Sequence, residues 1–352
     1  MAEPRVCVSI VTYNSQRYIR RCLEAVWNQE GVHPDVVVVD NASTDGTLKT
    51  LAEFRGRIRL IRNSRNEGFA SAQNRAIRAS PASWILALNP DALLTPGFLS
   101  KMLEAAELDS RAGAICGKLL SIGPGFEPLA EPLLDSTGIY VTPAMRHFDR
   151  GWHEPDRGQY QKTEYVFGAS GAAALYRRAM IEDISIDGEF FDSDFFSYRE
   201  DADVAWRAQL LGWRCIYTPD AVACHVRTVS PQNRRSLPAT INMHSVKNRF
   251  LLRIKNLTSG LWRRYWLPMT MRDAVVIGGC LLVEPASLCA FWHLARCLRN
   301  AVSRRRTVLS RRTVSDRDLA QWFSFQPVGL PVSVPISVES GKDIVLSSQT
   351  AV

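Results

Sequence analysis

Short apolar runs alternate with amphipathic segments along the first quarter of the chain. The runs are typical of β-strands, and the segments between them place apolar residues on one face of a helix. Predicted strands lie at 6–11, 35–40, 58–61 and 84–88, and predicted helices at 19–27, 47–54 and 69–79. The second strand has no polar alternation, as expected for a strand buried on both faces of a parallel sheet. This order predicts an α/β fold with a doubly wound, mostly parallel sheet, Rossmann-like in its nucleotide-binding half.

Polar loops follow three of these strands, at 12–14, 40–45 and 89–91. In a doubly wound sheet the ligand crevice lies beyond the carboxyl ends of the strands, so all three loops should line it. Their Asp and Asn side chains suit a nucleotide, since one carboxylate can accept from a base or ribose and another can hold a divalent cation on the phosphates. The chain contains neither G-x-G-x-x-G nor G-x-x-x-x-G-K-[ST], so neither a dinucleotide site nor a P-loop is supported.

A cluster of acids lies farther along, where an extended run turns into a predicted helix that Gly212 would end. The stretch carries four carboxylates beside several aromatic residues: Asp194, Glu200, Asp201 and Asp203. Acids at a helix start face the positive end of the helix dipole, which keeps them ionised and able to accept a proton. Two interpretations stand at this point: a catalytic carboxylate, or acids that only cap the helix and meet solvent.

The middle of the chain continues the same pattern less regularly. A helix is expected at 96–108, strands at 114–119, 164–167, 172–176 and 214–217, and loops with small strands over 121–161. The small-residue turn at 168–171 would let a backbone approach a ligand closely, although a plain tight turn fits it equally well. His225 is expected just past the last of these strands.

The C-terminal third is helical and basic. A helix is expected at 241–255, and the segment 262–298 is rich in Trp, Leu and Val but is interrupted by charged residues. No apolar run reaches the ~20 residues that a spanning helix needs, and arginines follow at 304–306 and 311–312. Such helices fit either elements in the headgroup region of a membrane or a helical subdomain packed on the core. The Pro, Ser and Val content after residue 326 predicts a poorly ordered tail.

The composition limits the classes of binding partner and the cellular compartment that we expect. The 352 residues are 46% hydrophobic, enough for a substantial core, and the net charge of +8 favours acidic partners such as nucleotide phosphates or an anionic membrane surface. No aromatic and basic platform or helix-turn-helix accompanies this charge, so nucleic acid is not expected. The eight cysteines form no CxxC pair, and residues 1–5 do not resemble a signal peptide. We therefore expect free thiols and a cytoplasmic protein, at most peripheral on the inner face of the plasma membrane.

Five ordered motifs resemble those of family 2 glycosyltransferases, and most closely the bacterial branch called rhamnosyltransferase-like. They read VSIVTYN at 8–14, VDNASTDGT at 39–47, NEGFA at 66–70 with Asn74, LNPD at 88–91 and EDAD at 200–203. Each motif alone is weak, but five in the expected order are specific. The resemblance implies a GT-A fold and an inverting transfer of a sugar from a nucleotide diphosphate.

The resemblance implies roles for residues by position. The base and ribose would be held by Thr12, Tyr13 and Asp40, with Asp40 accepting from a pyrimidine. The full donor-binding set that it implies is Thr12, Tyr13, Asn14, Asp40, Asn41, Asn66, Gly68, Asn74 and Asn89. Asp91 matches the last position of the family's Asp-x-Asp motif, where Mg²⁺ or Mn²⁺ binds on the diphosphate, and Asn89 replaces the first Asp. His225 resembles a position where some GT-A enzymes supply a further metal ligand, the alternative being a structural histidine.

The same resemblance gives the acid cluster a role. An inverting transfer needs one carboxylate to take the proton of the acceptor hydroxyl. By the family's pattern this base is Asp201, with Glu200 orienting the acceptor or its neighbours. The metal would replace a general acid by stabilising the leaving diphosphate. Asp203 and Arg207 are expected to brace the helix.

The implied protein is a GT-A domain with an extension. We expect the domain over 1–235, a nucleotide-sugar-binding half at 1–120, an acceptor-binding half at 121–235, a helical basic extension at 236–320 and a disordered tail at 321–352. The branch implies rhamnose on dTDP as donor, and a glycan or lipid-linked intermediate of surface polysaccharide synthesis as acceptor. A sugar nucleotidyltransferase would need a basic signature near the first strand, which 12–14 lack. A silent membrane-bound binding protein would not need Asp40, Asp91 and Asp201.

Overall fold

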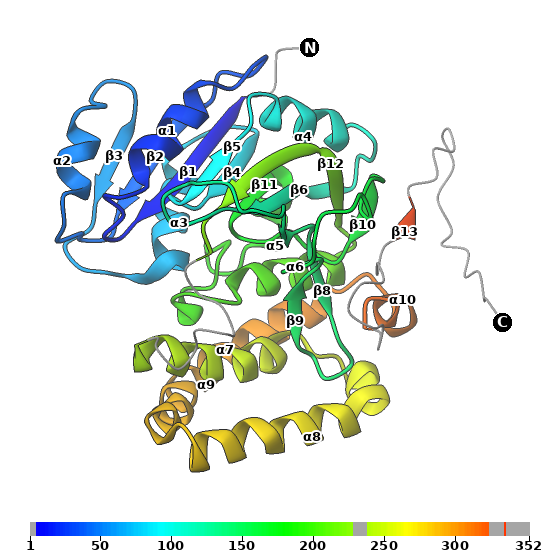
Figure 1. Cartoon of the computed structure of the whole chain (residues 1–352). Coiled ribbons are helices and arrows are strands. Elements are labelled where there is room, and N and C mark those ends of the chain that lie inside the picture. The colour runs from blue at the N-terminus through cyan, green and yellow to red at the C-terminus, as the bar shows by residue number, and fades with distance from the viewer. Residues whose placement is uncertain (1–4, 228–237, 324–333, 336–352) are drawn as a thin grey trace.

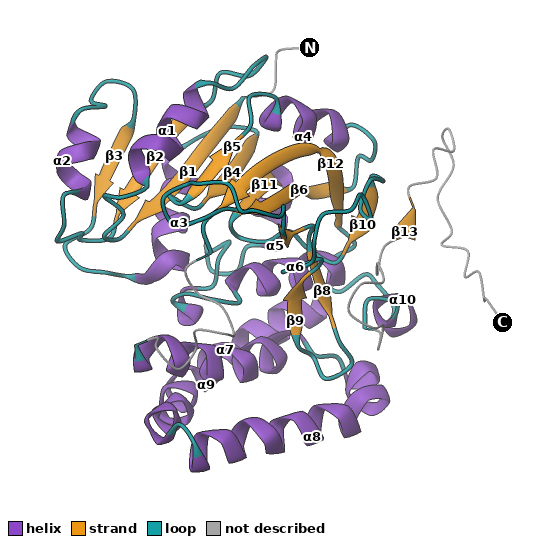
Figure 2. Cartoon of the chain, viewed as in Figure 1, coloured by secondary structure: helices purple, strands orange, loops and turns teal. Residues whose placement is uncertain are grey.

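A mixed β-sheet forms the centre of the computed structural model, which describes residues 5–227, 238–323 and 334–335 (Figures 1 and 2). The strands of this sheet are β1 (Val6–Thr12), β2 (Asp35–Asp40), β3 (Arg59–Arg62), β4 (Trp84–Leu88), β5 (Ala92–Leu94), β6 (Ala112–Ser121), β7 (Leu134–Ser136), β10 (Glu164–Val166), β11 (Ala173–Arg177), β12 (Arg214–His225) and β13 (Val334–Pro335). Their order is β13-β10-β12-β6-β11-β4-β1-β2-β3, with β5 beside β12 and β7 beside β6. A separate hairpin pairs β8 (Ile139–Val141) with β9 (His147–Asp149).

The N-terminal half of the sheet is parallel. β2 and β4 flank β1, and β3 continues the sheet beyond β2, all in parallel register. The ladder between β1 and β2 ends with Thr12 opposite Asp40, so the loops after these strands start side by side. The connecting helices are α1 (Ile19–Trp27), α2 (Thr47–Ala52) and α3 (Gly68–Ala79). This half confirms the doubly wound arrangement predicted from the alternating pattern.

The second half of the sheet is mixed. β11 runs antiparallel between β4 and β6, whereas β6 and β12 are parallel to each other. Its helices are α4 (Phe98–Ala106), α5 (Arg178–Ile184) and α6 (Glu200–Leu210). β12 extends well beyond the predicted strand at 214–217 and ends on His225, which pairs with Ala92 of β5. His225 is therefore part of the sheet, which corrects the expectation that it lies past the strand, and the pairing brings it beside the residues that follow β4.

The C-terminal helices pack on the side of the sheet that carries α6. They are α7 (Ala239–Asn256), α8 (Ser259–Leu282), α9 (Cys289–Ser310) and α10 (Asp316–Ala320). α7 and α9 both contact α6, and Figure 1 shows the group below the sheet. The predicted domain boundary at 235/236 lies outside the described residues.

One main apolar core joins the sheet to this helical group. Leu261, Tyr265 and Val308 from the helices belong to the same buried cluster as the strands, and so do Trp322 and Phe323. The predicted tail at 321–352 therefore begins too early, because its first aromatic residues are anchored in the core. The rest of that segment, apart from 334–335, lies outside the described residues. All eight cysteines are free thiols, as predicted.

Candidate active site

A cavity of about 540 Å³ opens where the carboxyl ends of β4 and β12 meet the start of α6. Its wall also includes residues of β9, α7 and α8. Five of the predicted site residues line it: Asn89, Asp91, Glu200, Asp201 and His225. The fold thus brings into one cavity three segments that are far apart in the sequence.

Asp91 and His225 face each other at one edge of this cavity. Asp91 Oδ1 lies 3.3 Å from His225 Nε2, and the Asn89 amide nitrogen lies 3.4 Å from the same ring nitrogen. The other ring nitrogen, Nδ1, lies 2.8 Å from Oδ2 of the buried Asp135. Burial alone would lower the pKa of His225, but the Asp135 and Asp91 carboxylates outweigh it and raise that pKa to about 10.

This edge fits a divalent cation that a substrate phosphate helps to hold. No group of three His, Cys, Asp or Glu side chains within residues 5–227 and 238–323 is placed to enclose a metal ion. A histidine that donates Nδ1–H to Asp135 presents Nε2 to the cavity beside Asp91, which gives two protein ligands once a cation displaces the proton that the raised pKa keeps on the ring. Mg²⁺ in proteins is commonly bound through one or two side chains together with phosphate oxygens and water. The residues present therefore fit an ion shared with a diphosphate.

The turn before α6 has an unusual backbone. Phe196, Tyr198 and Arg199 have positive φ angles of 67°, 71° and 71°. Such left-handed residues cost free energy and persist only where neighbouring groups fix them. The side-chain nitrogen of Asn248, from α7, lies 2.9, 2.8 and 2.7 Å from the carbonyl oxygens of Phe195, Ser197 and Tyr198. A residue of the C-terminal helices thus fixes the turn that presents the acids.

Asp201 and Glu200 differ in their hydrogen bonding. Asp201 Oδ2 accepts from the Gly171 N–H at 3.0 Å, and Oδ1 accepts from the Ala202 N–H at 2.7 Å. Glu200 is buried, and its Oε2 has no hydrogen-bond partner among the residues that the structure describes. Burial raises the pKa of both carboxyls, and for Glu200 the charge of Asp201 adds to the rise, which takes its pKa well above the ordinary value. Of the two, Asp201 is the carboxyl whose ionised form is stabilised by two N–H groups.

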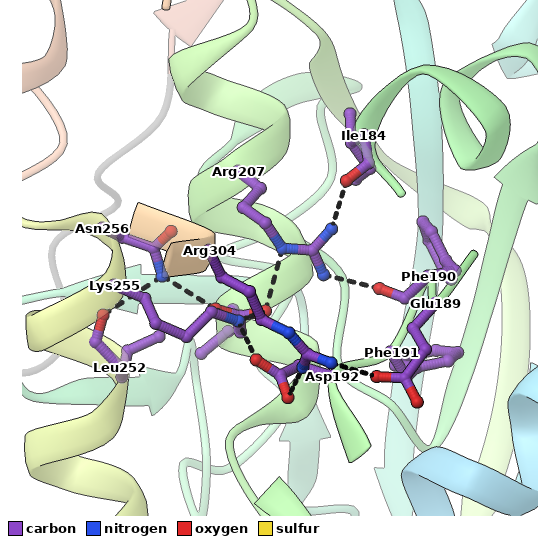
Figure 3. Close-up of polar contacts among 12 residues, drawn as sticks. Ile184, Glu189, Phe190, Phe191, Asp192, Arg207, Leu252, Lys255, Asn256 and Arg304 are labelled. Carbon is purple, nitrogen blue, oxygen red and sulfur yellow. Dashed lines mark hydrogen bonds and ion pairs between the residues drawn. The ribbon is translucent and has the colours of Figure 1, made fainter. Parts of the chain in front are cut away.

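Asp203 lies behind the cavity and braces α6. Arg207 donates Nε–H to Asp203 Oδ2 at 2.9 Å, and Lys255 Nζ lies 2.9 Å from each carboxylate oxygen. Asn256 donates to Oδ1 at 2.8 Å, and Lys255 also contacts Asp192. Figure 3 shows Arg207 converging with Lys255 and Asn256. The predicted brace by Asp203 and Arg207 is confirmed, and it extends into α7.

The loops after β1 and β2 form a second polar group. The Thr12 hydroxyl donates to Asp40 Oδ1 at 2.8 Å, and Ser43 donates its N–H and its hydroxyl to the same carboxylate at 3.0 and 2.6 Å. Asp40 is buried, whereas Tyr13 is 52% exposed. Asn14 accepts a hydrogen bond from the loop after β2 at 2.8 Å. The structure brings these predicted donor-binding residues together, beside the cavity and not in its wall.

Gly68 connects this polar group to the turn before α6. The Asn41 amide donates to the Gly68 carbonyl at 3.0 Å, and the Asn66 side chain accepts from the Gly68 N–H at 2.9 Å. Gly68 has a φ of +83°, and a Cβ there would lie 2.6 Å from the carbonyl oxygen of Phe196. The position therefore requires glycine, and it couples the loop after β2 to the acidic turn.

Asn74 lies apart from both groups. It is buried in α3, donates to the Phe191 carbonyl at 2.6 Å and accepts from the N–H groups of Phe190 and Phe191 at 3.1 and 2.9 Å. Both ends of its amide are engaged in holding this loop. The structure therefore gives Asn74 a structural role and does not bring it to the donor site that the motif implied.

A comparison with known families agrees with the geometry of the loops. The profile described as "Glycosyl transferase family 2" matches residues 7–185, which include the loops after β1, β2 and β4. The chain belongs to glycosyl transferase family 2. The enzyme class predicted from the five motifs is thereby confirmed. The match ends at residue 185, before α6. In this family 2 glycosyltransferase the assignment of Asp201 and His225 to the candidate site therefore rests on the geometry of the cavity.

Two curated relatives of this glycosyltransferase are named as a rhamnosyltransferase and as a protein of succinoglycan biosynthesis. An "N-acetylglucosaminyl-diphospho-decaprenol L-rhamnosyltransferase" of Mycobacterium tuberculosis is 27% identical over 295 residues, which cover 79% of this chain and 92% of that protein. The succinoglycan biosynthesis protein ExoO of Rhizobium meliloti is 39% identical over 105 residues, 30% of each chain.

Solved structures share the fold of this family 2 enzyme. GalNAc-T7 with UDP, GalNAc and Mn²⁺ superposes with a TM-score of 0.57 at 14% identity, covering 72% of this chain and 48% of that chain. A mannosyltransferase of Pyrobaculum calidifontis with GDP-Man and Mn²⁺ gives a TM-score of 0.50 at 18% identity, covering 88% and 86%. At such identities the likeness concerns the fold, and it confirms the predicted GT-A architecture.

Residues without any motif complete the site, and the sequence analysis missed them. Arg227 donates to Asp135 at 2.6 Å and contacts Asp149 at 2.7 Å, which holds Asp135 against the ring of His225. Asp135 lies in the irregular segment 121–161, and Asn248 lies in the C-terminal helices. The one sequence signal for Asp135 is its place directly after two leucines, where an acid would need a partner if buried.

Proposed function

We propose that the cavity is the active site of an inverting glycosyltransferase that uses a nucleotide-diphosphate sugar. The observation that carries this proposal is the meeting of Asp91 and His225 with Asp201 in one cavity. A leaving diphosphate needs a cation and an attacking hydroxyl needs a base, and the cavity has candidates for both. Membership of family 2 supports the reaction class.

In the proposed reaction Asp201 takes the proton of the acceptor hydroxyl. The hydroxyl attacks the anomeric carbon from the face opposite the diphosphate, so the configuration at that carbon inverts. Burial and the charge of Asp201 raise the pKa of Glu200 well above its ordinary value, which favours its protonated form. It therefore orients the acceptor as a hydrogen-bond donor and does not compete for the proton.

The proposed ligands of Mg²⁺ or Mn²⁺ are Asp91 and His225, with Asn89 beside them. When bound, the ion would stabilise the negative charge on the leaving diphosphate. Asp135 holds the His225 ring so that Nε2 faces the cavity. The two similar structures described above contain Mn²⁺, which supports a divalent cation here.

The proposed donor site extends from this edge to the loops after β1 and β2. The base and ribose would contact Thr12, Tyr13, Asn14 and Asp40, and the diphosphate would pass Asn41, Asn66 and Gly68 toward Asn89. The name of the mycobacterial relative supports rhamnose as the sugar and a lipid-linked acceptor. The proposal of dTDP as the carrier rests on the resemblance of the motifs.

A thermal-shift panel of nucleotide sugars with Mn²⁺ tests the proposed function. Because a ligand that binds only the folded state stabilises it, the correct donor should raise the Tm of the protein in a concentration-dependent way. dTDP-rhamnose is expected to give the largest rise among the sugars. A panel in which no nucleotide sugar raises the Tm above the value with Mn²⁺ alone would count against a donor site.

Replacing Asp91 with Ala is expected to weaken metal-dependent donor binding by at least about 10- to 100-fold, since even outer partners of metal ligands cost that much. Calorimetric titration with and without EDTA measures the effect. Asp220→Ala removes an exposed carboxylate of β12 that does not line the cavity, and it should bind like the wild type. If Asp91→Ala and Asp220→Ala bind the donor equally, Asp91 is not a metal ligand.

We further propose that α8 attaches the enzyme to an anionic membrane surface at the inner face of the plasma membrane. The helix buries Leu261 and Tyr265 in the core, yet its outer face exposes Trp262, Trp266, Leu267, Met271, Val275 and Leu282. A large exposed apolar patch usually marks a surface that another surface covers, and the described chain covers only the opposite face of this helix. No helix in the described part of the chain is long and apolar enough to cross a bilayer. Packing on the core and surface attachment, posed as alternatives by the sequence, are thus compatible.

Replacing Leu282 with Glu is expected to reduce binding to vesicles that contain phosphatidylglycerol by about tenfold or more. The reason is that a leucine inserted into the lipid interface is replaced by a charged side chain. Leu282 is 86% exposed, so the fold should not change. Leu108→Glu alters an exposed leucine after α4 and serves as the matched control in co-sedimentation. Equal sedimentation of both variants would argue against α8 as the attachment surface. Truncation after Asn256 is a poorer test, since it would also remove Tyr265 from the core.

A further inference from the structure

Three arginines of α7 and α8 lie at or near the cavity wall, and two of them pair with one carboxylate, that of Asp273. Arg249 and Arg272 line the cavity, and Arg253 lies one turn along α7 from Arg249. Arg253 donates to Asp273 Oδ2 at 2.7 Å, and Arg249 Nε lies 3.6 Å from Asp273 Oδ1. The cluster therefore contains three guanidinium groups and one carboxylate, which leaves an excess of two positive charges.

The guanidinium groups of this cluster are incompletely paired. The Nε atoms of Arg249, Arg253 and Arg272 are buried and have no hydrogen-bond partner among the described residues. Burial, together with the charge of Arg253, lowers the pKa of Arg249 to about 10. Since unpaired buried charge is costly, such an arrangement indicates a site that an anion completes. Arginine is also the side chain best suited to bind phosphate oxygens.

Positive charge continues from this cluster to β9. Arg146 and His147 line the same cavity, and Arg199 lies 2.7 Å from His147 Nδ1. Burial, with the charges of Arg199, Arg146 and Arg249, holds the pKa of His147 well below its ordinary value. His147 is thus neutral, and the positive potential in this part of the cavity comes from arginines alone.

An apolar surface adjoins the cluster on α8. Val276 lies one turn from Arg272 and also lines the cavity. The neighbouring residues Met271 and Val275 are 63% and 61% exposed, on the outer face described above. A ligand with an anionic head and an apolar chain could therefore contact the arginines and the outer face of α8 together.

We propose that Arg249 and Arg272 bind the diphosphate of a lipid-linked acceptor whose apolar chain lies along α8. This inference rests on the proposed function, and it assigns the acceptor a chemical class, a lipid diphosphate that carries the sugar to be extended. A diphosphate joined to a lipid and to a sugar carries two negative charges, which match the excess of the cluster. The diphosphate of the donor is assigned to Asp91 and His225, so the two anions have separate subsites.

Calorimetry on the full chain in EDTA tests this subsite, with farnesyl diphosphate as the probe and farnesol as its uncharged counterpart. The wild type should bind farnesyl diphosphate at least about tenfold more tightly than farnesol, and Arg272→Gln should lose about tenfold or more of the affinity for the diphosphate. Arg263→Gln removes the same charge from an exposed position of α8 and should bind like the wild type. Arg272→Lys should keep part of the affinity because it keeps the charge.

Equal binding of farnesyl diphosphate by wild type and Arg272→Gln would overturn the proposal, and so would an equal loss of affinity in Arg263→Gln.

Dihexanoyl phosphatidylglycerol is the second probe. If only this lipid binds, and its binding depends on Arg272, the cluster is a headgroup site and the acceptor assignment fails. A nucleoside diphosphate with Mn²⁺ is the third probe, and Arg272→Gln should bind it normally. Loss of that binding would assign the arginines to the donor. If the wild type binds farnesyl diphosphate but no nucleotide sugar, the proposed function fails while the anion subsite stands.

Discussion

Replacing Asp201 with Asn is expected to lower the rate of sugar transfer by about 10²- to 10⁴-fold while donor affinity changes little. Asn keeps the size of the side chain and can still accept a hydrogen bond, but it cannot take a proton. Asp201 accepts hydrogen bonds from the N–H groups of Gly171 and Ala202, and neither bond involves Asp91 or His225. The change should therefore appear in kcat and leave the Kd of the donor intact.

Glu200→Gln is the matched control for this experiment. Because the raised pKa of Glu200 favours its protonated form, Gln replaces it with a neutral group of nearly the same shape. Its loss of kcat should be less than about tenfold, well below that of Asp201→Asn. Full activity in Asp201→Asn, or a larger loss in Glu200→Gln than in Asp201→Asn, would remove Asp201 as the base.

The same assignment fixes the direction of the pH dependence. A base works in its ionised form, so kcat/KM should fall as the pH falls through the pKa of Asp201. Burial raises that pKa above the ordinary value of an aspartic acid, so the acid limb of the profile should lie at a higher pH than an exposed Asp would give. In Asp201→Asn this limb should disappear from the residual activity.

Replacing Lys255 with Met is expected to lower the free energy of unfolding by about 3–5 kcal/mol, because it leaves two buried carboxylates without the cation that they share. Lys255 is fully buried and contacts both Asp203 and Asp192. Burial alone would raise the pKa of Asp203, but Lys255 and Arg207 outweigh it and lower that pKa to about 2. The stability from this pairing is therefore fully present near neutral pH and is lost as the pH falls toward about 2.

Urea unfolding measured at neutral pH compares Lys255→Met with a surface control. Arg20→Gln breaks the exposed ion pair with Glu53, and solvent screening should leave its unfolding midpoint nearly unchanged. Because the brace joins α6 to α7, Lys255→Met should also lower activity at temperatures where the protein remains folded. Identical midpoints for the two variants would mean that the buried pair contributes nothing to stability.

The parallel half of the fold follows from local pattern. The strands predicted at 35–40 and 84–88 match β2 and β4 at both ends. Each is a continuous apolar run bounded by polar loops, so the pattern itself shows where the strand begins and ends. The loop positions also follow, since parallel strands place their carboxyl ends at one edge. For this reason the sequence could assign the loops after β1, β2 and β4 to one edge of the sheet, although of these loops only the one with Asn89 and Asp91 lines the cavity.

The partners that complete the site depend on long-range packing. His225 could be named from its position, but its contact with Asp91 depends on the pairing of β12 with β5, a strand of three residues without a pattern of its own. Asp135 and Asn248 come from segments whose place in the fold no local pattern specifies. Asn74 shows the opposite: its motif position suggested a role in donor binding, but its amide is engaged with the backbone of the loop at Phe190 and Phe191.

The stereochemistry of transfer tests the central claim, that this cavity performs inverting sugar transfer with Asp201 as base. The product formed from the donor that the thermal-shift panel selects and from a lipid-diphosphate-linked sugar can be analysed by NMR at its new glycosidic bond. We predict an anomeric configuration opposite to that of the donor, formed by the wild type and not at a comparable rate by Asp201→Asn. A product that retains the configuration of the donor would contradict the account.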